Sequence, residues 1–271
     1  MYKKIINQEG NEFHYYEYGI GNTRTLLFLP GYADIGLMYQ KLGRSLSKEY
    51  RVLALDFPMV HKPDKIYDLQ MLTTHVAKFI DQLSLENFTI AGFSSCGLVA
   101  ISYAYNHQDK INELILLNSV PRFILSKPNR IFYRTLKPFL LLRPILFIYS
   151  RLNTSKLVRK VLKLPPISSY TADRMKNFYY SVMGTAVNLV GESVFARFKK
   201  VKAPKKIIFF KDDTIIPWER YQRFVEKLDC EVVVFSEGLH ADKKIYWEKL
   251  KTLWLKTPKI EYQDVNIEKS K

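Results

Sequence analysis

The 271-residue chain has only two cysteines, Cys96 and Cys230, which excludes a fold held together by a framework of disulfides. It has no apolar run near the roughly 20 residues that a membrane-spanning helix needs. Its first residues also lack the apolar core of a secretory signal. We therefore expect a cytoplasmic protein whose two cysteines are reduced and packed beside strands. Peripheral association with the inner face of a membrane is an alternative.

Acidic residues are scarce in one part of the chain. From Arg122 to Lys206 there are 19 Lys and Arg and only two acids, Asp173 and Glu192, a local net charge of +17 in a chain whose total is +16. The remainder is therefore close to neutral. A positive excess confined to one segment indicates an acidic partner for that segment and says little about the fold.

Short apolar runs alternate with stretches of helical periodicity over most of the sequence. The expected strands are Glu12–Tyr18, Thr25–Leu29, Arg51–Leu55, Phe88–Ala91, Glu113–Leu117, Lys205–Phe210 and Glu231–Phe235. The expected helices are Leu37–Lys48, Asp68–Leu83, Ser95–Tyr105, Trp218–Leu228 and Lys243–Leu255. This alternation predicts an α/β fold with a mostly parallel central sheet flanked by helices.

The alternation stops between Pro121 and Ala203, where apolar and basic helical stretches follow one another without a convincing strand. We expect residues 1–120 and 204–256 to form one α/β core and residues 121–203 to form a helical insertion in it. Residues 257–271 are polar and charged, which is typical of a C-terminal tail.

One stretch of the sequence predicts a nucleophile. Residues 88–100 read Phe-Thr-Ile-Ala-Gly-Phe-Ser-Ser-Cys-Gly-Leu-Val-Ala, a short strand, a tight turn and a helix of small residues. Ser94 would lie at the apex of this turn, above the carboxyl edge of the sheet, and the small residues Gly92 and Cys96 would let the strand and the helix pass closely. The pattern is that of the nucleophile elbow, Gly-x-Ser-x-Gly, with Cys96 in place of the second glycine.

A serine hydroxyl needs a base to take its proton, and the base needs a carboxylate to orient it. Asp213 and His240 follow the last two apolar strands, so both are expected at the same sheet edge as Ser94. The order Ser94, Asp213, His240 predicts a catalytic triad. Asp212 is the alternative acid and Cys96 the alternative nucleophile. The other histidines are expected to be structural or solvated: His14, His61, His75 and His107.

These motifs resemble the α/β-hydrolase superfamily over nearly all of the first 255 residues. Asp213 to Pro217 matches the family pattern Asp-x-x-x-Pro, and His240 matches the Gly-x-His of its last loop. The family's His-Gly after the second buried strand is here Pro-Gly, at positions 30 and 31. The resemblance implies an oxyanion hole formed by the main-chain N–H groups of Tyr32 and Ser95.

In this superfamily an insertion after the sixth core strand forms a cap over the active site, and residues 121–203 have that position. Its apolar run Phe139–Tyr149 would line a tunnel for an aliphatic acyl chain. Its charge resembles that of the pimeloyl-acyl-carrier-protein methyl ester esterases, which implies an acidic acyl carrier protein as partner. An anionic membrane surface is the alternative, and nucleic acid is disfavoured because no binding module is recognisable.

The resemblance thus implies a serine esterase that cleaves carboxylic esters with an aliphatic acyl group, without a metal or an organic cofactor. The alternatives are an acyltransferase, a lipase or lysophospholipase at an anionic membrane, and a non-catalytic binding protein on a hydrolase scaffold. Epoxide hydrolase and dehalogenase chemistry is disfavoured, because those enzymes carry aspartate at the apex where this chain has Ser94.

Overall fold

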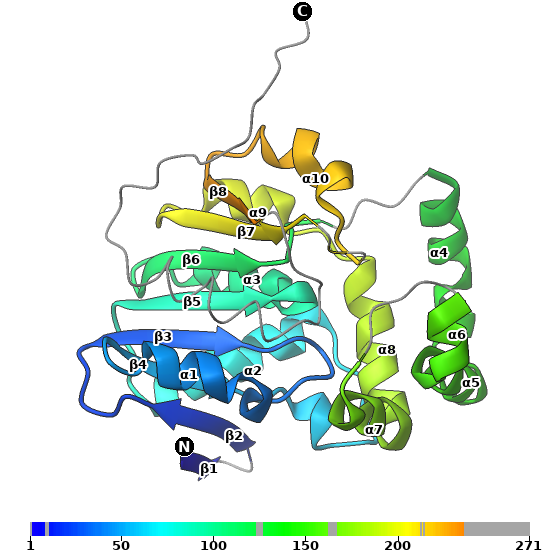
Figure 1. Ribbon diagram of the computed structural model, residues 1–271, viewed down its shortest axis with the longest axis horizontal. Coiled ribbons are helices and arrows are strands. Elements are labelled where there is room, and N and C mark those ends of the chain that lie inside the picture. Colours follow the sequence, from blue (N-terminus) through cyan, green and yellow to red (C-terminus); the bar gives the residue numbers. More distant parts are fainter. Residues whose placement is uncertain are drawn as a thin grey trace, which may run out of the picture.

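Eight strands form one sheet in the computed structural model, which describes residues 2–8, 11–122, 127–161, 167–211, 213 and 215–235. The strands are β1 (Tyr2–Gln8), β2 (Asn11–Tyr18), β3 (Arg24–Leu29), β4 (Tyr50–Leu55), β5 (Phe88–Phe93), β6 (Ile111–Leu117), β7 (Lys205–Phe210) and β8 (Glu231–Phe235). Their order in the sheet is β1-β2-β4-β3-β5-β6-β7-β8 (Figure 1). The pairs β1–β2 and β2–β4 are antiparallel, and all pairs from β4 to β8 are parallel. The predicted mostly parallel α/β sheet is confirmed.

Helices cover both faces of this sheet (Figure 1). One face packs against α1 (Gln40–Leu46), and the other packs against α2 (Leu69–Gln82), α3 (Gly97–Asn106), α9 (Phe195–Lys200) and α10 (Trp218–Val225). All six residues of β5 are buried. A central parallel strand that is covered on both sides needs an apolar run rather than an alternating one, and Phe88–Ala91 supplies it.

Helix α2 shows how the sequence determines an element. The Asp68 carboxylate accepts the Met71 N–H at 2.7 Å and so caps the helix. Leu72, Val76 and Phe79 recur at helical spacing and are fully buried against the sheet. The structure therefore places α2 within one residue of the predicted ends, Asp68 and Leu83.

Two elements differ from the sequence prediction. The helix expected over residues 37–48 begins as a 3₁₀ turn, Gly36–Tyr39, and becomes α-helical only at Gln40. At Gly36 a Cβ atom would lie 2.7 Å from the Ala54 carbonyl oxygen, so this turn is pressed against β4. Strand β1 was not predicted, because Tyr2–Gln8 lacks clear apolar alternation and pairs only at the edge of the sheet. The expected helix 243–255 and the tail 257–271 lie outside the described residues.

The insertion after β6 forms the helices α4 (Lys127–Leu140), α5 (Arg143–Thr154), α6 (Lys156–Val161), α7 (Ser169–Asn177) and α8 (Tyr179–Val190). In Figure 1, α8 lies beside the carboxyl ends of the strands, and α4, α5 and α6 lie farther out. The main-chain N–H of Tyr67 donates to Thr185 Oγ1 at 3.0 Å and fastens α8 to the core. Helix α9, at the end of the segment expected as the cap, packs against α3 through Arg197, which donates to Ser102 Oγ at 3.1 Å. Within the described residues, no helix is both long and apolar enough to cross a membrane.

Candidate active site

Ser94 lies in a strained turn between β5 and α3. The residues Ser94–Cys96 form one 3₁₀ turn, and Ser94 has a φ of 54°, in the left-handed region that a residue with a Cβ atom adopts only when its surroundings hold it there. Its side chain is 9% exposed. Strained backbone of this kind is concentrated at functional sites, and here it raises the serine above the carboxyl ends of the parallel strands.

Glycines on either side of the turn allow the strand and the helix to approach closely. A Cβ atom at Gly92 would lie 2.6 Å from the Gly97 Cα, and one at Gly97 would lie 2.0 Å from Ser119 Oγ. The close approach therefore depends on Gly92 and Gly97. On the helix side of the turn, Gly97 is the position with no room for a Cβ atom, whereas position 96 accommodates the buried cysteine side chain.

The structure argues against Cys96 as the nucleophile. Its side chain is fully buried, and this burial raises the pKa of the thiol well above its ordinary value. A thiol must ionise to attack, so Cys96 stays protonated and inert. Cys230 is partly exposed, and burial raises the pKa of its thiol to about 11.

Asp213 is held at the same edge of the sheet by three N–H groups. It follows β7 and is 1% exposed. Its Oδ1 accepts the main-chain N–H groups of Ile215 at 2.7 Å and Ile216 at 2.9 Å, and its Oδ2 accepts from Asn118 Nδ2. Three donors compensate a buried carboxylate and fix the direction of its oxygens.

Asn118 is a site residue that was not predicted from the sequence. It follows β6, has a φ of 40° and donates its main-chain N–H to the Ile208 carbonyl at 2.8 Å. Asparagine tolerates the left-handed region better than other residues with a Cβ atom, and this conformation accompanies the side-chain contact with Asp213 on the neighbouring loop. The one local signal was an Asn-Ser pair directly after a buried strand.

The two main-chain groups expected to form an oxyanion hole are also at this edge. Leu29, the last residue of β3, pairs with Gly92, so the chain at Tyr32 leaves the sheet beside the elbow. A Cβ atom at Gly31 would lie 3.2 Å from the Phe93 ring. Ser95 lies in the first turn after the strand, where main-chain N–H groups have no partner inside the helix.

Comparison with known proteins connects this geometry to a family. The model of the α/β-hydrolase fold matches residues 24–244, most of the chain. The chain belongs to the α/β-hydrolase family. An uncharacterized hydrolase of Bacillus subtilis, YugF, is 22% identical over 239 residues, which cover 83% of this chain and 86% of the relative.

Two solved structures are similar to this α/β hydrolase. An esterase from Exiguobacterium antarcticum has a TM-score of 0.67 at 21% identity and covers 94% of this chain and 98% of its own. An enol-lactonase from Burkholderia xenovorans has a TM-score of 0.71 at 17% identity and covers 93% of this chain and 98% of its own. At these identities the likeness shows the fold. The family match makes this chain a hydrolase of the α/β-hydrolase superfamily.

His240, the predicted base of the triad, and Asp212, the alternative acid, lie outside the described residues of this hydrolase. The complete triad therefore stays a prediction. What the structure brings together is Ser94 on the elbow, Asn118 and Asp213 on the two adjacent strand ends, and the main chain at Tyr32 and Ser95.

Arg159 of α6 is a buried cation in the cap. It is 9% exposed, and its Nη1 donates to the main-chain oxygen of Asn153 at 2.9 Å and to Asn153 Oδ1 at 2.7 Å. Burial lowers the pKa of its guanidinium, whereas the nearby Tyr32 phenol opposes this effect. Arg159 is one of the 19 basic residues of the segment from Arg122 to Lys206, but the structure buries it and brings it toward Tyr32.

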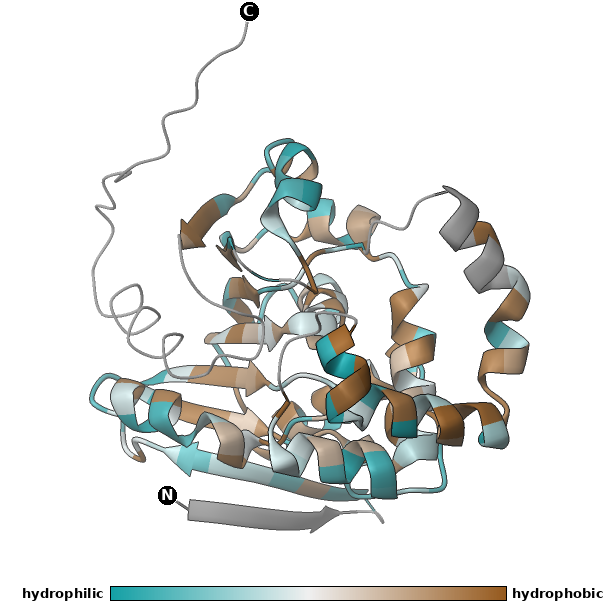
Figure 2. Ribbon diagram, turned by 45° about the vertical axis from the view of Figure 1, so that its right-hand side comes forward, coloured by the Kyte–Doolittle hydropathy of each residue, from teal (hydrophilic) through white to brown (hydrophobic). Residues whose placement is uncertain are grey.

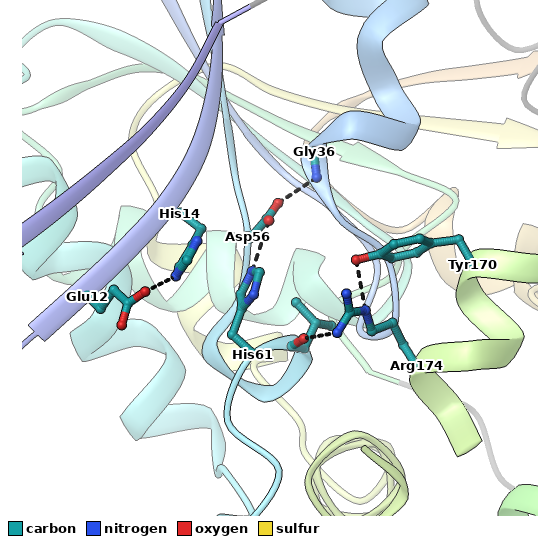
Figure 3. A network of polar contacts seen from close by, with 8 residues as sticks. Glu12, His14, Gly36, Asp56, His61, Tyr170 and Arg174 are labelled. Carbon is teal, nitrogen blue, oxygen red and sulfur yellow. Dashed lines mark hydrogen bonds and ion pairs between the residues drawn. The ribbon is translucent and has the colours of Figure 1, made fainter. Parts of the chain in front are cut away.

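The histidines near the end of β4 belong to a polar network that orders loops (Figure 3). His61 Nε2 lies 3.0 Å from Asp56 Oδ2, and the Gly36 N–H donates to Asp56 Oδ1 at 2.6 Å. The rings of His14 and His61 stack with their centroids 4.0 Å apart, and His14 contacts Glu12. Among the described residues, no group of His, Cys, Asp and Glu has a metal-binding arrangement. These contacts agree with the structural role expected for His14 and His61.

His75 packs beside this network and gives a pH prediction. Burial lowers the pKa of its imidazole from 6.5 to about 4, and no described residue contacts its Nε2 by a hydrogen bond. The unfolded chain therefore binds a proton at a higher pH than the folded chain does, so the contribution of His75 to stability is complete above pH 6.5 and is lost as the pH falls toward 4. We expect the free energy of unfolding to fall by about 2 kcal/mol more in the wild type than in His75→Asn between pH 7 and pH 5. Urea denaturation at fixed ionic strength measures this difference, and equal losses in both proteins would contradict it.

A cleft of about 490 Å³ opens near the same histidine, at the start of α2. Its lining includes Glu12, Lys62, His75 and Lys78 and none of the residues around Ser94. It is therefore separate from the candidate active site.

Proposed function

We propose that this hydrolase is a serine esterase that cleaves carboxylic esters with an aliphatic acyl group. The observation that carries the proposal is the strained turn that holds Ser94, with a φ of 54°, at the carboxyl edge of the sheet. The buried Asp213, which accepts three hydrogen bonds, follows β7 at the same edge. Esters suit this arrangement because a serine alkoxide attacks a carbonyl carbon and the acyl-serine that forms is open to water.

Each step of ester cleavage is then assigned to a named group. The Ser94 hydroxyl attacks the ester carbonyl while His240 takes its proton and later returns it to the leaving alcohol. Asp213 orients the imidazole, and Asn118 holds the Asp213 carboxylate in place. The main-chain N–H groups of Tyr32 and Ser95 stabilise the oxyanion, and loss of one such donor typically lowers the rate by about 10²–10³. A water molecule that loses a proton to His240 then attacks the acyl carbonyl, and the proton passes from His240 to the Ser94 oxygen as the carboxylic acid leaves.

The acyl group and the partner are proposed from the cap. Helix α8 is the cap helix that packs against the elbow turn Ser94–Cys96, and its mostly apolar residues favour an aliphatic acyl chain over a small polar one. The positive charge of the cap favours presentation of the ester by an acidic partner, either an acyl carrier protein or an anionic lipid surface. Acyl transfer is the second candidate, because an alcohol could replace water at the acyl-serine without any change in the site.

A series of p-nitrophenyl esters from acetate to dodecanoate tests the proposal. We expect kcat/KM to rise by about tenfold or more from acetate to octanoate, because each buried methylene contributes up to about 0.8 kcal/mol of binding. An aliphatic epoxide of matched length is the control and should not react. Hydrolysis of the epoxide but of no ester would contradict the proposal, and formation of a new ester when a primary alcohol is added would indicate the acyltransferase.

A further inference from the structure

The outer cap helices expose an unusual number of large apolar side chains. Among the large apolar side chains exposed in the described part of the chain, only Ile20 and Ile215 lie outside the outer cap. The others are on α4, α5 and α6 or, for Leu142, in the turn between α4 and α5: Ile131, Phe139, Leu142, Ile145, Phe147, Ile148, Tyr149, Leu152, Leu157 and Val161. Figure 2 shows hydrophobic residues on these helices, which stand apart from the strands. We call this set the outer cap face. Exposed apolar patches of this kind mark interaction surfaces.

Helix α5 presents its apolar residues away from the protein. Its buried positions are Leu146, Ser150 and Thr154, four residues apart. Two of these three are small and polar, and Ser150 Oγ is bonded to the Met175 carbonyl of α7. The opposite side of the helix carries Ile145, Ile148 and Leu152, which are 37%, 56% and 50% exposed. The expected role of the run 139–149 was to line an acyl tunnel, but most of its large residues face outward.

The charge around the outer cap face has one sign. The sequence has no Asp or Glu between residues 114 and 172, whereas nine Lys and Arg lie between 127 and 161. Arg143, Arg151, Lys156 and Lys160 are among those exposed. The Arg151 guanidinium lies 4.9 Å from the centre of the Phe147 ring, so cations and apolar side chains share one surface. Long basic side chains can keep their charge in a polar layer while the apolar stems and rings enter a non-polar one.

We propose that the outer cap face docks on a lipid surface with anionic headgroups. Its apolar side chains would enter the boundary between headgroups and acyl chains, and the surrounding cations would bind the headgroup phosphates. In this arrangement α4, α5 and α6 lie along the lipid surface. None of the described helices is both long and apolar enough to cross a membrane. A second copy of the chain is disfavoured as the occupant, because it would bring the same positive charge to the interface. The proposal concerns binding and is independent of the ester chemistry.

Vesicle flotation of the full chain tests the docking. We compare vesicles of phosphatidylcholine alone with vesicles in which about one-third of the lipid is phosphatidylglycerol. One double variant replaces exposed apolar residues, Ile148→Gln with Leu152→Gln, and the other replaces exposed lysines, Lys156→Gln with Lys160→Gln. Each double substitution should weaken binding to the anionic vesicles by about tenfold. The loss in the lysine pair should disappear at high salt, whereas the loss in the apolar pair should persist.

Matched controls lie at the other end of the sheet, on α1 and directly after α1. Ile20→Gln removes an exposed isoleucine in the turn between β2 and β3, and Lys41→Gln with Lys48→Gln removes two exposed lysines. Both controls should bind like the wild type. Three results would overturn the proposal. The protein could bind neutral and anionic vesicles equally, or the cap variants and the controls could lose equal affinity. The protein could also be a dimer in solution that the pair Ile148→Gln and Leu152→Gln dissociates. A fourth such result would be binding to an acidic carrier protein in the absence of any vesicle binding.

Discussion

Ser94→Ala is expected to lower kcat on the octanoate ester by about 10⁴-fold or more, because the covalent route through the acyl-enzyme is lost. The residual rate would come from substrate binding and from the oxyanion donors. The substitution removes one oxygen atom from a 9% exposed side chain, so the circular dichroism spectrum and the melting temperature should change little. Steady-state kinetics with an active-site-titrated wild type measures the loss.

Ser94→Gly separates catalysis from the strain of the turn. Glycine adopts a φ of 54° without the penalty that a Cβ atom brings. Both variants lack the hydroxyl and should be equally inactive, but Ser94→Gly should be about 1 kcal/mol more stable than Ser94→Ala. Retention of more than a tenth of the wild-type kcat in either variant would remove Ser94 from the role of nucleophile.

Asp213→Asn is expected to lower kcat by about 10⁴-fold, because an amide cannot hold the imidazole in the tautomer that accepts the serine proton. It should also destabilise the fold by about 1–3 kcal/mol. The main-chain N–H groups of Ile215 and Ile216 and the Asn118 side-chain amide all donate to carboxylate oxygens, and an amide keeps only one oxygen. Either a buried donor then meets an NH₂ group or the Asn118 side chain must turn over. Kinetics and urea denaturation measure the two effects.

Asp212→Asn is the matched control for the acid, one residue away. If Asp213 orients His240, Asp212→Asn should change kcat by less than about threefold. Asn118→Ala should lower kcat by about tenfold, because the Asp213 carboxylate is then held less firmly. A large loss in Asp212→Asn together with a small one in Asp213→Asn would move the acid to Asp212.

Much of this site follows from local sequence. The elbow, the strand before Asp213 and the turn after β3 were predictable because each depends on residues close together in the chain, such as Gly92, Ser94 and Gly97. Asn118 was not, since its contact joins it to a residue 95 positions away and only the packing of β6 beside β7 creates it. Parallel strands that pair are joined by long crossover connections, so their pairing produces no local sequence motif in either strand.

The cap shows a second limit of sequence reasoning. Periodicity in α5 indicates an amphipathic helix but does not say which side faces the protein. The structure buries Ser150 and Thr154 and exposes Ile148 and Leu152, the reverse of the usual arrangement. Arg159 illustrates the same limit, because composition places it with the surface charge and the fold buries it. Tertiary packing decides both.

Labelling with a fluorophosphonate, followed by intact-mass measurement of the wild type, Ser94→Ala and His240→Ala, tests most directly whether Ser94 is an activated nucleophile. Such a probe reacts with a serine only when a base removes its proton and donors stabilise the oxyanion. We predict one adduct on the folded wild type and none on either variant. An unlabelled, folded wild type, or an adduct that persists in Ser94→Ala, would contradict the proposed mechanism.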